Sequence, residues 1–383
     1  MRNKGGILTP EQAASKYNWV QYDPETKVIS LLMDNHMLST LRMCESKFVE
    51  EHIFNIRPNG GHSWSLSHGA YLHSCFEYFY NSMRDGKICT IQEFLANGKE
   101  LWFAYDLDYF KNEDKYQEIR GLEGSLGLLT MYYAYYYDLR LRVIGTEIPF
   151  GFNKEVPIGE FEIIIGYNPC DYNPRPIRLK CYLTGRIDLM VDNGYKIGPV
   201  DHKHSHKFRG DEWTKFNPHD GLTGYIYTTN AIMKQAFPKY FEQNRQCLSG
   251  WIFHISACMP IPRDKTKQLI RFKSTPIDKT PEMLEDYRLR QITTFKRVAD
   301  LLFNEETPQW STDRCHFMFG RKCEYIPIHE APAREKEQIV NRLYHIAPQW
   351  NPEQIDEDNY IGRDKNVTTT ETVLSGGSSN EQS

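Results

Sequence analysis

Within the segment from residue 183 to residue 207, Asp188, Asp201 and Lys203 have a spacing that could organise a metal ion. An apolar run around Asp188 is followed by an Asp-Asn-Gly sequence and then by a second run that ends at Asp201, His202 and Lys203. Asn-Gly between two such runs predicts a β-hairpin. A carboxylate inside an apolar strand is costly to bury unless it is paired or bound to a metal. Asp188 therefore needs a partner, and Asp201 is placed to supply one.

Within this predicted hairpin, Asp201 and Lys203 share one face because strand side chains alternate. We expect Asp188 and Asp201 to hold Mg²⁺ or Mn²⁺, with the backbone carbonyl of His202 completing the protein ligands. The metal would lower the pKa of a bound water, and Lys203 could orient or deprotonate that water and offset charge on a phosphate. These groups suit hydrolysis of a phosphodiester. The alternative interpretation is an ordinary strand pair with solvated charges.

An aromatic helix is predicted from Ser65 to Met83, and it carries His73 and Glu77. Residues four apart share one helix face. His73 is therefore a candidate metal ligand, which Glu77 would orient as a hydrogen-bond acceptor. Gly69, one turn earlier, would let the helix approach the sheet closely. The alternative is a core histidine that is hydrogen-bonded to Glu77.

These motifs resemble the PD-(D/E)xK nuclease superfamily, whose defining residues match Asp188 and the triplet at 201–203. The flanking segments resemble its RecB-like exonuclease branch. The segment CESKF at 44–48 is similar to the Cys-x-x-(Arg/Lys)-Phe element of that branch, and residues 69–77 are similar to its Gly-x-x-x-His-x-x-x-Glu helix. Tyr225 matches a Gln-x-x-x-Tyr element that contacts DNA or supports the catalytic lysine, although Gly221 stands at the glutamine position.

The cysteines near the C-terminus resemble those of an iron-sulfur subset of these nucleases, found in phage and CRISPR-associated proteins. In that subset one early cysteine joins three late ones. Cys44, Cys315 and Cys323 match this order, and His329 replaces the last cysteine. Three thiols and one imidazole could hold a 4Fe-4S cluster or a tetrahedral Zn²⁺. The alternative is that the cysteines only pack.

The resemblance implies an α/β, restriction-endonuclease-like core, with a central mixed sheet of about five strands, helices on both faces and an added helical arm. We expect an N-terminal arm at 1–33, in which Thr9 caps a short helix from Pro10 to Tyr17, and the nuclease-like domain at 34–347. A tail at 348–383 is rich in Ser, Thr and Gly from about residue 364, which predicts disorder there.

Composition sets further limits. A chain of 383 residues with 40% apolar residues can bury a large core. Its net charge of -4 argues against coating nucleic acid by bulk charge, so a nuclease would need a local basic track. The candidates are Lys203, Lys207, Arg209 and Lys215 beside the proposed centre, and Arg263, Lys265, Lys267, Arg271 and Lys273 further on. The odd number of cysteines, nine, does not suggest a secreted disulfide framework. Without an apolar run long enough for a membrane span or a signal-peptide pattern, we expect a soluble, cytoplasmic protein with no membrane contact.

The expected function is that of a Mg²⁺- or Mn²⁺-dependent deoxyribonuclease, an exonuclease or end-processing enzyme in recombination or repair, in a phage setting. This preference comes from the resemblance. Its partners would be DNA, as linear or single-stranded ends, and a recombination or single-strand-binding protein. The alternatives are a non-catalytic nucleic-acid-binding recombination partner with the same fold, or a nuclease that acts on RNA.

Overall fold

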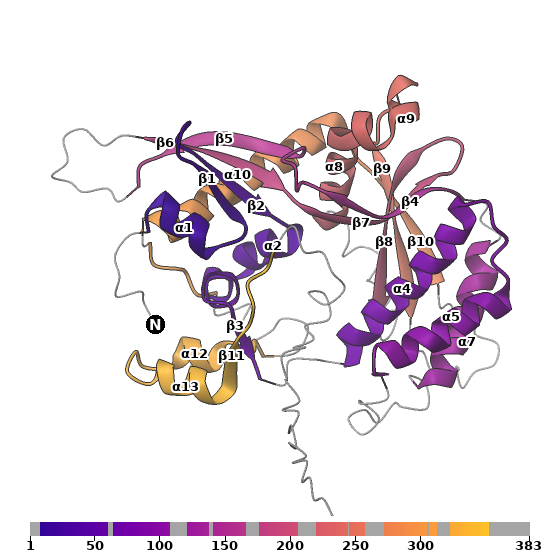
Figure 1. Cartoon of the computed structure of the whole chain (residues 1–383), viewed down its shortest axis with the longest axis horizontal. Coiled ribbons are helices and arrows are strands. Elements are labelled where there is room, and N and C mark those ends of the chain that lie inside the picture. Colours follow the sequence, from indigo (N-terminus) through magenta and orange to yellow (C-terminus); the bar gives the residue numbers. More distant parts are fainter. Residues whose placement is uncertain are drawn as a thin grey trace, which may run out of the picture.

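The structure is a computed structural model, and it contains two large β-sheets with helices packed around them (Figure 1). The predicted α/β class, with a mixed sheet flanked by helices, is confirmed. The structure describes residues 8–59, 64–107, 121–137, 141–165, 176–205, 220–243, 245–256, 272–304, 306–311 and 322–351.

The five-stranded sheet contains the predicted hairpin, and its strand order is β10-β9-β8-β7-β4. Only the pairing of β8 with β9 is parallel, so the sheet is mixed. The hairpin turns at Asn193 and Gly194, where the Asn193 Oδ1 atom accepts a hydrogen bond from the backbone N–H of Lys196 at 2.9 Å. Gly194 has a φ of +91°, which glycine adopts without steric cost. The strands are β4 (Arg142–Phe150), β7 (Gly185–Asp192), β8 (Ile197–Ser205), β9 (Ser249–Ser256) and β10 (Phe272–Asp278).

Helices cover both faces of this sheet, because successive residues of its strands point to opposite faces and apolar side chains occur on both. Leu189 of β7 joins an aromatic core with α4 (Trp64–Arg84), α5 (Ile91–Ala104) and α7 (Leu122–Tyr137). Its neighbour Met190 instead joins the core that contains Leu222 and Ile226 of α8 (Asp220–Ala236). α9 (Pro238–Glu242) follows α8. The cartoon shows α4 across one side of the sheet, with α5 and α7 outside it (Figure 1).

The four-stranded sheet has the order β1-β2-β6-β5, with β2 and β6 parallel. Two of its strands come from the segment expected to be an N-terminal arm, and these two strands were not predicted. The predicted helix before them is present, and the Thr9 side chain accepts from the backbone N–H of Gln12 in a capping box. α10 packs on β5. The elements are α1 (Pro10–Lys16), β1 (Val20–Asp23), β2 (Val28–Met33), β5 (Pro157–Ile163), β6 (Ile177–Leu183) and α10 (Pro281–Phe303).

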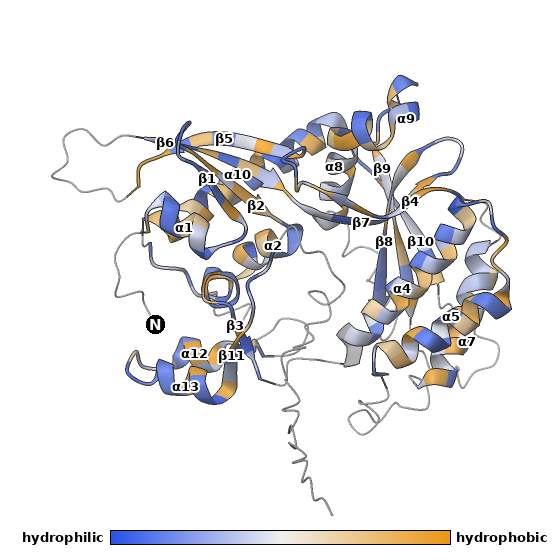
Figure 2. Cartoon of the chain, viewed as in Figure 1, coloured by the Kyte–Doolittle hydropathy of each residue, from blue (hydrophilic) through white to orange (hydrophobic). Residues whose placement is uncertain are grey.

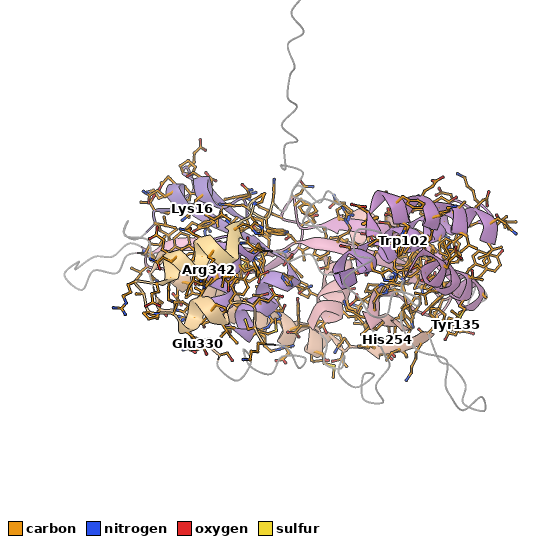
Figure 3. All side chains as sticks on the ribbon, turned by 90° about the horizontal axis from the view of Figure 1, so that it is seen from below. Lys16, Trp102, Tyr135, His254, Glu330 and Arg342 are labelled. Atoms are coloured by element: carbon orange, nitrogen blue, oxygen red, sulfur yellow. The ribbon has the colours of Figure 1, made fainter. Side chains whose placement is uncertain are left out.

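Residues from the two ends of the described chain meet in a third group of elements. β11 pairs antiparallel with β3, and the Tyr325 hydroxyl donates to the Ile56 carbonyl at 2.8 Å. Figure 3 shows Lys16, Glu330 and Arg342 in one half of the molecule and Trp102, Tyr135 and His254 in the other. The elements of this group are α2 (Asn35–Met43), α3 (Glu45–Phe48), the π-helix η1 (Val49–Ile53), β3 (Ile56–Pro58), α12 (Ile326–Glu330), α13 (Lys336–Leu343) and β11 (Tyr344–Ile346).

The tyrosine-rich sequence from 126 to 144 favours one continuous helix, but α7 ends at Tyr137 and residues from Arg142 onward pair with β7 as strand β4. The sequence from 268 to 273 favours a strand; β10 continues to Asp278, and residues 268–271 lie outside the described residues. None of the described helices combines the length and the apolar character that crossing a bilayer requires. The expected tail from residue 364 lies outside the described residues.

Candidate active site

Three neighbouring strands each contribute one carboxylate to the same end of the five-stranded sheet. The ladder between β4 and β7 pairs Thr146 with Leu189 and Ile148 with Ile187, so Glu147 lies across from Asp188 between these two pairs. Continuing the ladder between β7 and β8 by one residue places Asp201 on the other side of Asp188. Figure 2 shows the polar stretch of β8 as a blue segment within the sheet. The two predicted acids therefore meet, as the hairpin required.

Asp188 lies at the centre of this group. Its Oδ2 atom accepts a hydrogen bond from the backbone N–H of His202 at 3.2 Å and lies 3.7 Å from the His73 Nδ1 atom. Burial raises the pKa of Asp188; the charge of Asp201 acts in the same direction, whereas His73 and Lys203 oppose it. A divalent cation would offset this cost because it supplies the positive charge that two adjacent carboxylates lack.

Lys203 is held by Asp201, since its Nζ atom donates to the Asp201 Oδ1 atom at 2.8 Å. Both side chains lie on one face of β8, as strand alternation predicts. Burial by itself lowers the pKa of Lys203, but Asp201 and Asp188 outweigh that effect and leave the pKa raised. The lysine is therefore a cation at neutral pH. Its side chain is 38% exposed, against 4% for Asp201, so the ammonium group can meet a substrate.

His73 and His202 complete a set of metal ligands. One ring nitrogen of each and one oxygen of Asp188 all lie within 4.8 Å of one another. Nitrogen and carboxylate ligands together suit Mn²⁺ and heavier ions, while the adjoining acids suit Mg²⁺. The imidazole of His202 is thus a potential ligand; that its backbone carbonyl binds the metal stays a prediction. Asp201 lies beside this set and is paired with Lys203.

Aromatic side chains fix the ring of His202. Its Nε2 atom lies 3.0 Å from the Tyr132 hydroxyl, which in turn lies 2.7 Å from the Tyr80 hydroxyl. Phe76 stacks on the ring with 5.0 Å between the ring centroids. Burial lowers the pKa of His202 well below its ordinary value, so the imidazole is neutral, the form that can bind a metal.

Glu147 has two unusual properties. Its backbone has a φ of +45°, a left-handed conformation that costs a non-glycine residue about 1–3 kcal/mol and is frequent at functional sites. Its pKa is raised to about 8 by burial and by the charge of Asp188, although Arg186 lies 3.3 Å from its Oε2 atom. The Glu147 side chain is only 19% exposed and lies beside Asp188 in the sheet.

Three supporting predictions have different outcomes. The Glu77 charge contributes to the raised pKa of Glu147, which places Glu77 near the carboxylates; its hydrogen bond to His73 stays a prediction. The role given to Gly69 was wrong, because within the described part of the chain a Cβ atom there would meet no atom beyond its own helix backbone within 4 Å. Tyr225 is partly buried on α8, with its ring 6.3 Å from that of Phe150. A role in DNA contact stays a prediction.

The predicted cluster site is described only in part. Cys44 and Cys323 pack against Ile326 in one small apolar cluster. The ring of His329 lies 5.8 Å from that of Trp310, and burial lowers its pKa to about 4. Within the described residues, the ligand atoms of Cys44, Cys323 and His329 do not come together as the active-site ligands do. Cys315 lies outside the described residues, as do Lys207, Arg209 and Lys215.

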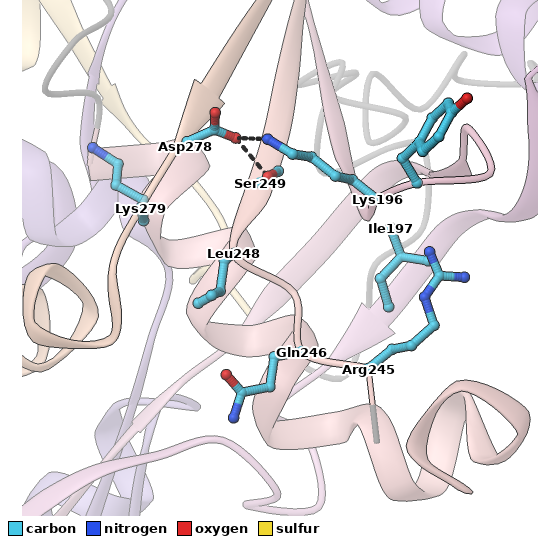
Figure 4. A pocket seen from close by; sticks show the side chains of 9 residues that line it. Lys196, Ile197, Arg245, Gln246, Leu248, Ser249, Asp278 and Lys279 are labelled. Carbon is cyan, nitrogen blue, oxygen red and sulfur yellow. Dashed lines mark hydrogen bonds and ion pairs between the residues drawn. The ribbon is translucent and has the colours of Figure 1, made fainter. Parts of the chain in front are cut away.

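A cavity of about 490 Å³ lies at the other end of the hairpin, beside its turn (Figure 4). Lys196, Arg245 and Asp278 are among the residues that line it. The Lys196 Nζ atom lies 2.8 Å from the Asp278 Oδ1 atom. Asp278 is the one carboxylate among the residues that line the cavity, and Lys196 already neutralises it. The candidate active site is therefore the carboxylate end of the sheet.

Comparison with known proteins supports this assignment. No curated protein matches the chain significantly. A sequence model of the PD-(D/E)XK nuclease superfamily, however, matches residues 36–328. This range includes every strand of the five-stranded sheet and all of the carboxylates described above. The chain belongs to the PD-(D/E)XK nuclease superfamily.

Proposed function

We propose that this protein hydrolyses phosphodiester bonds in DNA with the help of Mg²⁺ or Mn²⁺. One observation carries the proposal: the partly buried carboxylate of Asp188 lies beside Asp201, and Asp201 holds the ammonium group of Lys203. Paired acids with an adjacent lysine combine a cation site with a group that stabilises negative charge on a phosphate. Membership of the nuclease superfamily points to the same chemistry.

Each residue has a separate role in the proposed reaction. His73, Asp188, Asp201 and His202 would hold the metal, which when bound lowers the pKa of the attacking water and polarises the phosphate. Lys203 stabilises the charge that develops on the scissile phosphate. Tyr132 keeps the His202 ring oriented through its hydroxyl group. Glu147 is protonated at neutral pH in the metal-free protein, because its pKa is about 8.

The preference for an exonuclease or end-processing enzyme in recombination or repair rests on resemblance to the RecB-like branch. A specific observation favours catalysis over a purely binding role. Burial and the charge of Asp188 raise the pKa of Glu147, and carboxyl groups perturbed in this way cluster at catalytic sites, whereas a DNA-binding scaffold has no need of them. The RNA alternative differs only in substrate, so the same assay decides it.

The test is a nuclease assay on end-labelled linear DNA, closed circular DNA and RNA of the same sequence, with Mg²⁺ or Mn²⁺. We expect the wild-type protein to degrade linear DNA and leave the circle intact, and Asp188→Asn to be inactive on all three substrates. Binding of DNA without turnover at any metal concentration would refute the proposal. Cleavage of RNA alone would change the substrate class, and cutting of the circle would exclude an end-dependent enzyme.

The cysteine site is proposed separately. If Cys44, Cys315, Cys323 and His329 hold a 4Fe-4S cluster, protein purified without oxygen will absorb visible light, and Cys323→Ser will abolish that absorbance. If they hold Zn²⁺, the purified protein will be colourless and contain zinc that Cys323→Ser loses. Colourless, zinc-free protein would mean that these cysteines only pack.

A further inference from the structure

Three potential metal ligands outside the active site meet between helix α2 and the π-helix η1. They are His36, Glu51 and His52, and one ligand atom of each lies within 4.8 Å of the other two. The His36 Nε2 atom is 3.7 Å from the Glu51 Oε1 atom, and the two histidine rings are 5.8 Å apart between centroids. We propose that these residues form a second metal site, which binds a transition metal such as Zn²⁺.

His52 supplies an independent reason to expect a ligand. Its relative exposure is only 5%, and neither ring nitrogen has a hydrogen-bond partner in the described structure. Buried polar atoms are nearly always paired, so an unpaired imidazole needs an explanation. The Glu51 Oε2 atom also lacks a hydrogen bond there. A bound metal would satisfy one nitrogen of His52 and a carboxylate oxygen of Glu51 together.

The local backbone explains how Glu51 and His52, which are adjacent in sequence, can both face His36. Residues Val49–Ile53 form a π-helix, closed by a hydrogen bond from the Phe54 N–H to the Val49 carbonyl at 2.9 Å. Short π-helical segments are rare in proteins, and many of those that occur lie at functional sites. Here the segment directs both Glu51 and His52 toward His36. His36 is 64% exposed, so its side chain is free to complete the coordination.

The donor set selects the class of metal. Two imidazoles and one carboxylate match three-ligand zinc sites, in which a water or another group occupies the fourth position. Mg²⁺ prefers oxygen ligands, so it is expected to bind at the active-site acids rather than here.

Two cations compete for the same carboxylate. The Lys47 Nζ atom lies 3.7 Å from the Glu51 Oε2 atom, and the Arg57 Nη1 atom lies 4.0 Å from the Glu51 Oε1 atom. The charge of Lys47 competes with a metal for Glu51 whichever carboxylate oxygen the metal takes, so Lys47 should weaken metal binding. The proposal therefore predicts two opposite effects on metal affinity: removal of a ligand must weaken metal binding, whereas removal of Lys47 must strengthen it.

The experiment measures Zn²⁺ binding to the full-length chain. All variants carry Asp188→Asn, His73→Ala and Cys323→Ser, so that the active site and the cysteines contribute less. Zinc stoichiometry and affinity are obtained by competition with a chromophoric chelator, with and without excess Mg²⁺. We expect His36→Ala to lose one equivalent of Zn²⁺ or to bind it at least tenfold more weakly, because it removes one of three ligands. Lys47→Met should bind Zn²⁺ more tightly than its parent.

His36→Ala is a suitable variant because the side chain is mostly exposed, so circular dichroism and the zinc-free unfolding temperature should match the parent. Equal stoichiometry and affinity in the parent and in His36→Ala would overturn the proposal, as would displacement of the zinc by Mg²⁺. If His36→Ala does not fold, the result for Lys47→Met decides: unchanged affinity overturns the site, and tighter binding supports it. None of these outcomes depends on nuclease activity.

Discussion

Replacing Lys203 with methionine should separate catalysis from metal binding. Lys203→Met leaves the Asp201 carboxylate, which is only 4% exposed, without the ammonium group that lies 2.8 Å from it, so the free energy of unfolding should fall by about 1–3 kcal/mol. The loss of a positioned cation at a developing negative charge typically costs about 10²–10³ in rate, or about 2.7–4 kcal/mol. Metal affinity should not fall, because Lys203→Met frees the Asp201 carboxylate from its competing cation.

The assay is single-turnover cleavage of end-labelled linear DNA at saturating Mn²⁺, combined with calorimetric titration of Mn²⁺ into the free protein. Lys196→Met is the matched control. Its Nζ atom also lies 2.8 Å from an aspartate, Asp278, but at the opposite end of β8 (Figure 4). We expect Lys196→Met to cleave at the wild-type rate. An unchanged cleavage rate in Lys203→Met, or an equal loss in both variants, would refute the role given to Lys203.

Three further predictions concern the same site. Asp188→Asn should weaken Mn²⁺ binding at least tenfold in the same titration, while the metal-free protein becomes about 1 kcal/mol more stable to urea, because a buried charge with a raised pKa is removed. Glu147 binds a proton more tightly in the folded state, with a pKa of about 8 against an ordinary 4.5, so the stability of the metal-free protein should fall as pH rises through that window. Urea midpoints measured in chelator should show this slope, and Glu147→Gln should flatten it. Tyr132→Phe should cost about 1–3 kcal/mol of stability, because His202 and Tyr80 lose their shared partner, whereas Tyr133→Phe, whose hydroxyl bonds only the Cys89 carbonyl from a half-buried position, should cost less.

The hairpin could be predicted from sequence because its signals are local. The Asn-Gly turn, the alternation of β8 and the acid inside an apolar strand all lie within residues 183–207. The position of Lys203 beside Asp201 then follows from strand geometry alone. Helix α4 was equally predictable, because the signals for its 21 residues all lie within one continuous stretch of sequence. The family resemblance added the order of the motifs along the chain.

The remaining features depend on tertiary contacts that no local pattern encodes. Residues Val28–Met33 are buried throughout, and so short an apolar run does not distinguish a central strand from a helix. Tyr132 reaches His202 across 70 positions of sequence. The left-handed conformation of Glu147 has no sequence signal at all, since the residue is not a glycine. The π-helix that presents His52 was likewise not predicted.

The parallel pairing of β8 with β9 has a consequence for biosynthesis. The antiparallel partner, β7, precedes β8 by a tight turn, so these two strands can join soon after they leave the ribosome. The partner on the other edge, β9, follows only after helix α8, at residues 249–256. The five-stranded sheet of a nascent chain therefore stays incomplete until roughly two thirds of the chain has been translated. Truncated products that end before β9 should be inert toward nucleic acid in the host cell.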